Sequence, residues 1–329
     1  MTLRKAGGRI APVLQSGLAL LVAIACLTAR AEQPLSVVLN WTPNAQHAPL
    51  FYARAQGWYR QAGIELSIEP LLGSPAAIAR VASGGNSLAV SDFVAWLRAA
   101  AKGAPGTAVM VLDDASPYAF YFDRARGPGQ AAEFHDRRLA AQPQDPMRAL
   151  WPVLAARLGV DATVQWVDLV NPAKPDALAR GEVDVALNAF LHNHLGYAAA
   201  LGEQLGVLWW RELGFDAYGL VLVSSAPLMR DAPDLLRRFV AVTQAAWTQS
   251  RAAPAPCVDA LILAQPDLDR AHELALWQLA QALPAGAFDD TRVQRTWADV
   301  EAAFGVRAPV GRSVVNREFL PAAGREVKN

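Results

Sequence analysis

Short apolar runs alternate with segments of helical spacing along the first third of the chain. Runs at 35–39, 64–69 and 87–90 have the length of strands, whereas 49–56 and 93–101 repeat apolar side chains at helical spacing. Strands that alternate with helices form a mostly parallel sheet, because the crossover between parallel neighbours is usually a helix. The alternation therefore predicts an α/β fold.

A polar stretch rich in glycine and proline interrupts this pattern at 124–136, and the pattern then resumes. A helix is expected over 146–158, with strands at 164–170 and 183–187, and the chain beyond residue 226 is almost purely helical. The repetition predicts two α/β lobes joined by two crossover strands.

The predicted lobe boundaries lie where this pattern of apolar and polar residues changes. They are 32–123 for the first part of lobe 1, 124–217 for lobe 2, and 218–329 for the return to lobe 1 and a helical C-terminal tail. Ligands of open α/β sheets bind beyond the carboxyl ends of the strands. The loops that follow the strands are therefore the place to look for a site.

Residues 1–31 have the features of a cleaved signal peptide. Basic residues precede an apolar run at 14–27, and a small–x–small pattern ends at Ala31. The run is shorter than the roughly 20 residues of a membrane span. A lipid anchor at Cys26 is the alternative, although Ala23 stands where lipoprotein signals usually carry leucine. We expect export to the periplasm.

Charge and cysteine content exclude several classes of protein. The 30 basic and 30 acidic side chains give a formal net charge of zero, without the basic excess of a nucleic-acid binder. Beyond the signal peptide Cys257 is the only cysteine, so neither a disulfide framework nor a thiolate zinc site is expected.

The loop at 40–47, after the first strand, is rich in groups that recognise polar aromatic molecules. Asn40 and Asn44 offer amides that both donate and accept hydrogen bonds, Trp41 offers an aromatic face, and His47 an imidazole. The loop also precedes a helix start, where backbone N–H groups are free. The alternative is a turn with asparagine caps and a core tryptophan.

Similar polar and aromatic pairs end other strands. They are Ser91 and Asp92, Ser116 and Tyr118, Asn188 and Phe190, and Asp216 and Tyr218. Each pair alone is more often a helix cap with a core aromatic, but their recurrence favours a shared cleft.

Signals of catalysis are weak. His192 and His194 lack further metal ligands nearby, and no Gly-x-Ser-x-Gly elbow occurs. We expect no enzyme activity, metal or cofactor.

The segment 39–47, with 50–53 and 56–66, resembles the opening of solute-binding proteins for pyrimidine precursors of thiamine. That family supplies periplasmic components of ATP-driven importers, and is related to sulfonate, taurine and nitrate binders and to yeast pyrimidine synthase. Segments 181–186 and 316–321 are similar to later motifs of the family.

The resemblance implies a bilobal periplasmic-binding-protein type II fold, with two mostly parallel sheets, that closes by a hinge over a small heteroaromatic ligand. It implies a monomer that works with the permease and ATPase subunits of an ABC importer. One cleft wall would carry Trp41, Asn44, His47, Ser91 and Asp92; the other would carry Asn188, Phe190 and His194. Asn40, Tyr118, Asp216 and Tyr218 complete the candidate site.

Two departures from the family affect the expected ligand. His194 stands where pyrimidine binders carry a glutamate, and the loop 142–146 lacks their Gly/Ser/Thr run. A thiamine pyrimidine precursor is the best candidate; a sulfonate, nitrate or flavin-type solute is the alternative, and missing basic residues disfavour small oxyanions. A synthase-like enzyme is the remaining alternative, but its cysteine-rich iron motif is absent and no histidine lies near 93–97.

Overall fold

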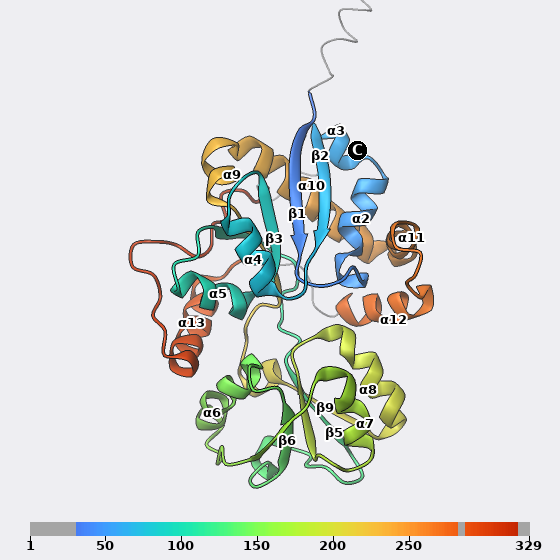
Figure 1. Cartoon of the computed structure of the whole chain (residues 1–329), viewed down its shortest axis with the longest axis vertical. Helices are drawn as coiled ribbons and strands as arrows, with labels where there is room; N and C mark the ends of the chain where they lie inside the picture. Colours follow the sequence, from blue (N-terminus) through green and yellow to red (C-terminus); the bar gives the residue numbers. More distant parts are fainter. Residues whose placement is uncertain (1–30, 282–286, 322–329) are drawn as a thin grey trace, which may run out of the picture.

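The computed structural model describes residues 31–281 and 287–321, and the chain forms two lobes (Figure 1). Cys26 and nearly all of the predicted signal peptide lie outside the described residues. Within the described residues no helix is long and apolar enough to span a membrane.

Lobe 1 is built on a five-stranded sheet in the order β2-β1-β3-β10-β4. Its strands are β1 (Gln33–Leu39), β2 (Ile64–Pro70), β3 (Ser87–Asp92), β4 (Thr107–Val111) and β10 (Leu220–Ser224). Strands β1, β2 and β3 pair in parallel, with Val37 opposite Ile68, whereas β10 runs antiparallel to both β3 and β4.

Lobe 2 repeats this arrangement in the order β7-β6-β8-β5-β9. Its strands are β5 (Ala119–Asp123), β6 (Arg138–Ala141), β7 (Gln165–Asp168), β8 (Val185–Asn188) and β9 (Leu205–Trp209). Here β5 is the antiparallel strand. The prediction of two mostly parallel sheets is therefore confirmed. Each sheet contains one antiparallel strand, and that strand directly follows a crossover between the lobes.

The predicted lobe boundary after Asp123 differs from the strand pairing. Residues 119–123 form β5, which pairs with β8 and β9 of lobe 2, so the chain crosses at 112–118 and returns at 210–219. The polar stretch at 124–136 marks a loop inside lobe 2, because the aromatic run before it is a buried strand of that lobe.

Helices cover both faces of each sheet. In lobe 1 they are α2 (Ala48–Ala55), α3 (Trp58–Gln61), α4 (Ser74–Ala82), α5 (Phe93–Ala101), α9 (Ala226–Asp231), α10 (Pro233–Ala252), α11 (Pro254–Ala264), α12 (Arg270–Gln281) and α13 (Asp290–Phe304). In lobe 2 they are α6 (Pro146–Leu158), α7 (Lys174–Ala179) and α8 (His194–Leu201). Short 3-10 turns are η1 (Ala45–His47), η2 (Ala131–Glu133), η3 (Asn171–Ala173), η4 (Leu191–Asn193), η5 (Gly202–Gln204) and η6 (Trp210–Leu213). The helical C-terminal region is confirmed.

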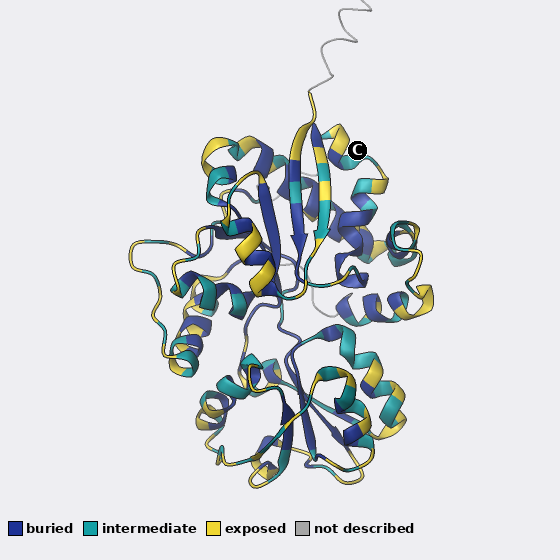
Figure 2. Ribbon diagram, viewed as in Figure 1, coloured by how far each residue is buried: buried dark blue, intermediate teal, exposed yellow. Residues whose placement is uncertain are grey.

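The central strands are buried on both faces, whereas the edge strands β2 and β7 are partly exposed (Figure 2). Successive side chains of a strand point to opposite faces, so Val38 packs under α4 and α5 while Val37 packs under α2 and α10. The cluster that contains Val38 continues through Tyr118 and Trp210 to Trp151 on α6. One apolar core therefore extends through both lobes.

Candidate ligand-binding site

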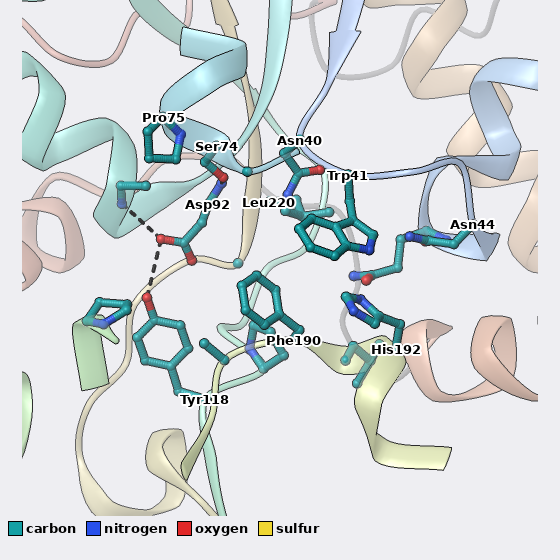
Figure 3. A pocket seen from close by; sticks show the side chains of 18 of the residues that line it. Asn40, Trp41, Asn44, Ser74, Pro75, Asp92, Tyr118, Phe190, His192 and Leu220 are labelled. Carbon is teal, nitrogen blue, oxygen red and sulfur yellow. Dashed lines mark hydrogen bonds between the residues drawn. The ribbon is translucent and has the colours of Figure 1, made fainter. Parts of the chain in front are cut away.

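A cavity of about 160 Å3, open to solvent, lies between the two lobes (Figure 3). Lobe 1 contributes the loop after β1, the starts of α4 and α5, and the start of β10; lobe 2 contributes the loop after β8 and the start of α6. The lining residues that bear on its chemistry are Asn40, Trp41, Asn44, Gln46, His47, Ser74, Asp92, Arg98, Tyr118, Phe190 and His192. The cavity thus meets the carboxyl ends of β1, β3 and β8, where α/β sheets bind ligands.

Seven residues singled out from the sequence line this cavity. They are Asn40, Trp41, Asn44, His47, Asp92, Tyr118 and Phe190. They come from both lobes and from the first crossover, so the structure brings together segments far apart in the sequence.

Ser91 and Asn188 do not line the cavity. The Ser91 side chain is buried within β3, where its hydroxyl donates to the carbonyl of Asp92 at 2.9 Å. The Asn188 amide donates to the carbonyl of Phe190 at 2.8 Å and accepts from Asn193 at 2.9 Å. Asn188 therefore shapes the loop that carries Phe190.

His194 also lies outside the cavity, and His192 lines it instead. The His194 ring hydrogen-bonds to the Tyr121 hydroxyl at 3.0 Å and stacks on Trp209 with the centroids 6.1 Å apart. The position expected to replace the family's carboxylate thus faces the interior of lobe 2, because α8 begins at this residue and turns it away.

Asp216 and Tyr218 belong to the second crossover and not to the cavity lining. Asp216 pairs with Arg292 at 3.0 Å, and the Tyr218 ring packs against Phe93 and Phe288. Both residues thus attach the second crossover to lobe 1.

Aromatic rings from the two lobes meet at one wall of the cavity (Figure 3). The Trp41 indole of lobe 1 lies 6.1 Å from the Phe190 ring and 5.7 Å from the His192 ring, with interplanar angles of 27° and 18°. Burial, and next the charge of His272, lower the pKa of His192 to about 4. The wall is therefore aromatic and uncharged at neutral pH.

A carboxylate lies at another wall, at the start of α5 (Figure 3). Asp92 caps this helix by accepting the Ala95 N–H at 2.9 Å, and the Tyr118 hydroxyl donates to the same oxygen at 3.3 Å. Burial raises the pKa of Asp92 to about 6, against the opposing effect of these hydrogen bonds. Asp92 is therefore mainly ionised at neutral pH, at a cost in desolvation.

His47 is a buried neutral imidazole beside the cavity. Its Nε2 lies 3.0 Å from the Asn40 side-chain oxygen and donates to it, so Nδ1 is left as an acceptor, and no partner is found for it among the described residues. Burial, and then the charge of His192, lower the pKa of His47 to about 3. The imidazole can accept a hydrogen bond but carries no charge.

Ser74, Arg98 and Gln46 line the cavity but were not among the predicted site residues. The Ser74 hydroxyl accepts the Asp92 N–H at 2.9 Å. Arg98 follows Ala95 by three residues, so the two lie on the same face of α5 and both line the cavity. Gln46 donates to the buried carboxylate of Asp113 at 2.9 Å, and burial raises the pKa of Asp113 to about 7.

No group of three or more His, Cys, Asp or Glu side chains suited to a metal ion occurs among residues 31–281 and 287–321.

The two lobes and the cavity between them define a bilobal periplasmic-binding-protein fold. It is similar to the ligand-binding component of an ABC-type import system from Staphylococcus aureus, at a TM-score of 0.65 and 16% identity, over 88% of this chain and 98% of that one. It is also similar to the periplasmic aliphatic sulphonate-binding protein of Escherichia coli, at a TM-score of 0.68 and 14% identity, over 91% and 99%.

Within this class, residues 44–256 match the family described as NMT1/THI5 like, and the chain belongs to that family. It is 25% identical to a riboflavin-binding protein of Chloroflexus aurantiacus, over 88% of this chain and 86% of that protein. It is 22% identical to the 4-amino-5-hydroxymethyl-2-methylpyrimidine phosphate synthase of Legionella pneumophila, over 71% and 74%. The relatives of this chain thus include a protein named for binding and a protein named for synthesis.

Proposed function

We propose that this protein is the exported solute-binding component of an ABC importer, and that it captures a small heteroaromatic solute between its lobes. The best candidate is a pyrimidine precursor of thiamine. Family membership, the fold shared with a component of an ABC-type import system, and the predicted signal peptide support this proposal. Its partners are then a permease and an ATPase, and its location is the periplasm.

The pairing of an aromatic wall with a carboxylate is the observation that carries the choice of ligand. A planar ring stacks favourably on Trp41 or Phe190. The ionised carboxylate of Asp92 accepts hydrogen bonds from an amino group on that ring, and such charge-assisted bonds are strong. An aminopyrimidine presents both features.

The charges around the cavity disfavour a small anion. Arg98 is the one basic residue that lines the described cavity besides the neutral histidines, and it already attracts the carboxylate of Asp92. The starts of α5 and α6, which offer N–H groups to anions, are capped by Asp92 and Asp145. A sulfonate or nitrate would therefore lie beside an existing negative charge.

A flavin-type solute is the second candidate. The relative from Chloroflexus aurantiacus is named for riboflavin binding, and its similarity spans most of both chains. A flavin also has a planar ring that can stack on Trp41.

A thermal-shift panel on the purified mature chain tests the proposal. The panel contains hydroxymethyl and formylamino pyrimidines, thiamine, riboflavin, taurine, alkyl sulfonates and nitrate. A ligand at about 100 times its Kd adds about 2.7 kcal/mol to the free energy of unfolding. A shift with the pyrimidines alone supports the leading proposal, and a shift with riboflavin alone supports the second. A shift only with sulfonates or nitrate contradicts the heteroaromatic assignment.

The variant Asp92→Asn tests the contribution of the Asp92 carboxylate to ligand binding. Asparagine still caps α5, so the fold is kept while the charge is lost. The pKa of Asp92 is about 6, so wild-type affinity for an aminopyrimidine is expected to fall as the pH drops from 7 to 5, approaching about tenfold per pH unit below 6. The variant should bind more weakly at pH 7 and lose this part of the pH dependence. Equal affinity profiles by calorimetry would contradict the role of Asp92.

A synthase-like activity is the alternative from another class, since a relative carries that name. Iron retained in stoichiometric amount by the purified protein after loading, measured by metal analysis, would favour that alternative over transport.

A further inference from the structure

The two crossovers between the lobes lie against each other as a two-stranded ribbon. Ser116 donates its N–H to the carbonyl of Ala217 at 2.9 Å, and Gly219 donates to the carbonyl of Asp113 at 3.0 Å. A side chain at Gly219 would place its Cβ 2.6 Å from the carbonyl oxygen of Ala115. Any change of the angle between the lobes must therefore twist or bend this ribbon as a unit.

One side chain of α13 holds both strands of the ribbon. The Arg292 guanidinium donates from Nη1 to Asp114 Oδ1 at 3.0 Å, and from Nη2 to the Asp114 carbonyl, in the first crossover. In the second crossover it donates from Nε to the Asp216 carbonyl at 2.9 Å and from Nη2 to the Ala217 carbonyl at 3.2 Å. Its Cζ also lies 3.9 Å from the centroid of the Tyr218 ring.

The start of α13 is attached to the same ribbon. The Tyr218 hydroxyl donates to the Ala287 carbonyl at 3.1 Å and accepts the Asp289 N–H at 2.7 Å, while Asp289 caps α13. The Arg292 side chain is only 11% exposed. Its hydrogen bonds to the backbone carbonyls are therefore largely shielded from water, whereas the carboxylates of Asp114 and Asp216 are 37% and 47% exposed and their ion pairs are partly screened.

We propose that Arg292 is a positioning residue that fixes the angle between the lobes by clamping both crossovers to α13. Arginine suits this role because its planar group presents five donors in fixed directions, which a lysine ammonium cannot reproduce. None of these contacts reaches the cavity lining, so the effect on a ligand is indirect. The apparent affinity of a ligand that contacts both lobes falls with the fraction of molecules that have the lobe arrangement to which it binds.

The interlobe distance in the ligand-free protein tests this proposal without relying on any ligand. Spin labels are attached at Ala79→Cys on α4 and Ala199→Cys on α8, both exposed and one on each lobe, while Cys257 is buried. Electron–electron double resonance then gives the distance distribution. We expect Arg292→Met to broaden it and shift it, and the control Gln294→Met, an exposed position on the same helix, to leave it unchanged.

A merely structural role for Arg292 would lower the melting temperature and leave the distances unchanged, and this result overturns the proposal. If Arg292→Met does not fold, Arg292→Lys is measured instead, and the same two results decide.

The consequence for affinity rests on the proposed function. We expect the affinity of the solute found in the panel to fall roughly three- to tenfold in Arg292→Met, in line with a modest shift of population. A changed distance distribution with no solute bound by the wild-type protein would count against the proposed function and leave the hinge role intact.

Discussion

Trp41 is the side chain at which lobe 1 reaches the aromatic groups of lobe 2. It is half-buried, and its indole lies nearly parallel to Phe190 and His192 at the cavity wall. We expect a ring at this position to contribute to ligand contact more than to the core, because the large buried clusters of both lobes do not include it.

Trp41→Ala is therefore expected to weaken binding more than it weakens the fold. Loss of a tryptophan at the centre of a binding surface costs about 2 kcal/mol, or roughly thirtyfold in Kd, while the melting temperature should change little. Calorimetric titration and thermal unfolding measure the two effects. Trp58→Ala is the matched control, since Trp58 packs on Tyr52 away from the cavity and should affect stability alone. Unchanged affinity in a destabilised Trp41→Ala protein would contradict this view.

The predictability of single residues depends on how far they lie from a strand end. The loop at 40–47 follows β1 directly, and Asn40, Trp41, Asn44 and His47 were all identified. At β3 the alternation of side chains places Ser91 inside the sheet and Asp92 at the cavity. After β8 a 3-10 turn precedes a helix, and this local geometry decides that His192, and not His194, lines the cavity.

At the scale of elements, a buried ion pair connects two walls of lobe 2. Lys174 on α7 is fully buried, donates to the Leu187 carbonyl of β8 at 2.8 Å, and lies 3.6 Å from Asp145. Asp145 caps α6 by accepting the Met147 N–H at 3.0 Å. Burial lowers the pKa of Lys174 and raises that of Asp145, so each charge depends on the other.

Lys174→Met should destabilise the protein by about 3–5 kcal/mol, because it leaves the carboxylate of Asp145 buried without its partner. Asp145→Asn retains the helix cap, so the double variant is expected to recover part of this loss. Urea denaturation of the wild type, both single variants and the double variant measures the coupling. Strictly additive losses would show that the pair is not coupled.

Most elements could be predicted from apolar spacing and turn signals, whereas β6, β9 and α8 were not predicted. The strand β6 has only four residues and begins with a charged one. The helix α8 has apolar and small residues around most of its circumference, so it lacks the one-sided pattern of an amphipathic helix. Strand β5 directly precedes the polar stretch at 124–136, and only its pairing with β8 and β9 shows that it belongs to lobe 2.

At the scale of the whole molecule, one apolar core is shared by the two lobes. A single cluster extends from Trp96 and Trp297 in lobe 1, through Tyr118 and Trp210, to Trp151 in lobe 2. Neither lobe can lose this core without exposing apolar surface of the other.

We therefore expect the protein to unfold in one cooperative transition. Scanning calorimetry should give a calorimetric enthalpy equal to the van't Hoff enthalpy, which is the criterion for two-state behaviour. A ligand should move this single transition to higher temperature without splitting it. Two resolved transitions, one for each lobe, would show that the shared cluster does not couple them.

The position of β10 in the sheet of lobe 1 has a consequence for the order in which the chain becomes structured during synthesis. Strand β4 joins that sheet only through β10, which is made after all of lobe 2. The strands of lobe 2 are contiguous in sequence, between residues 119 and 209, and can assemble as soon as they have been made. Lobe 1 is therefore begun first and completed last. In the nascent chain β4 lacks its partner strand, and its backbone N–H and C=O groups stay unpaired on that side, until residues 220–224 have been synthesised.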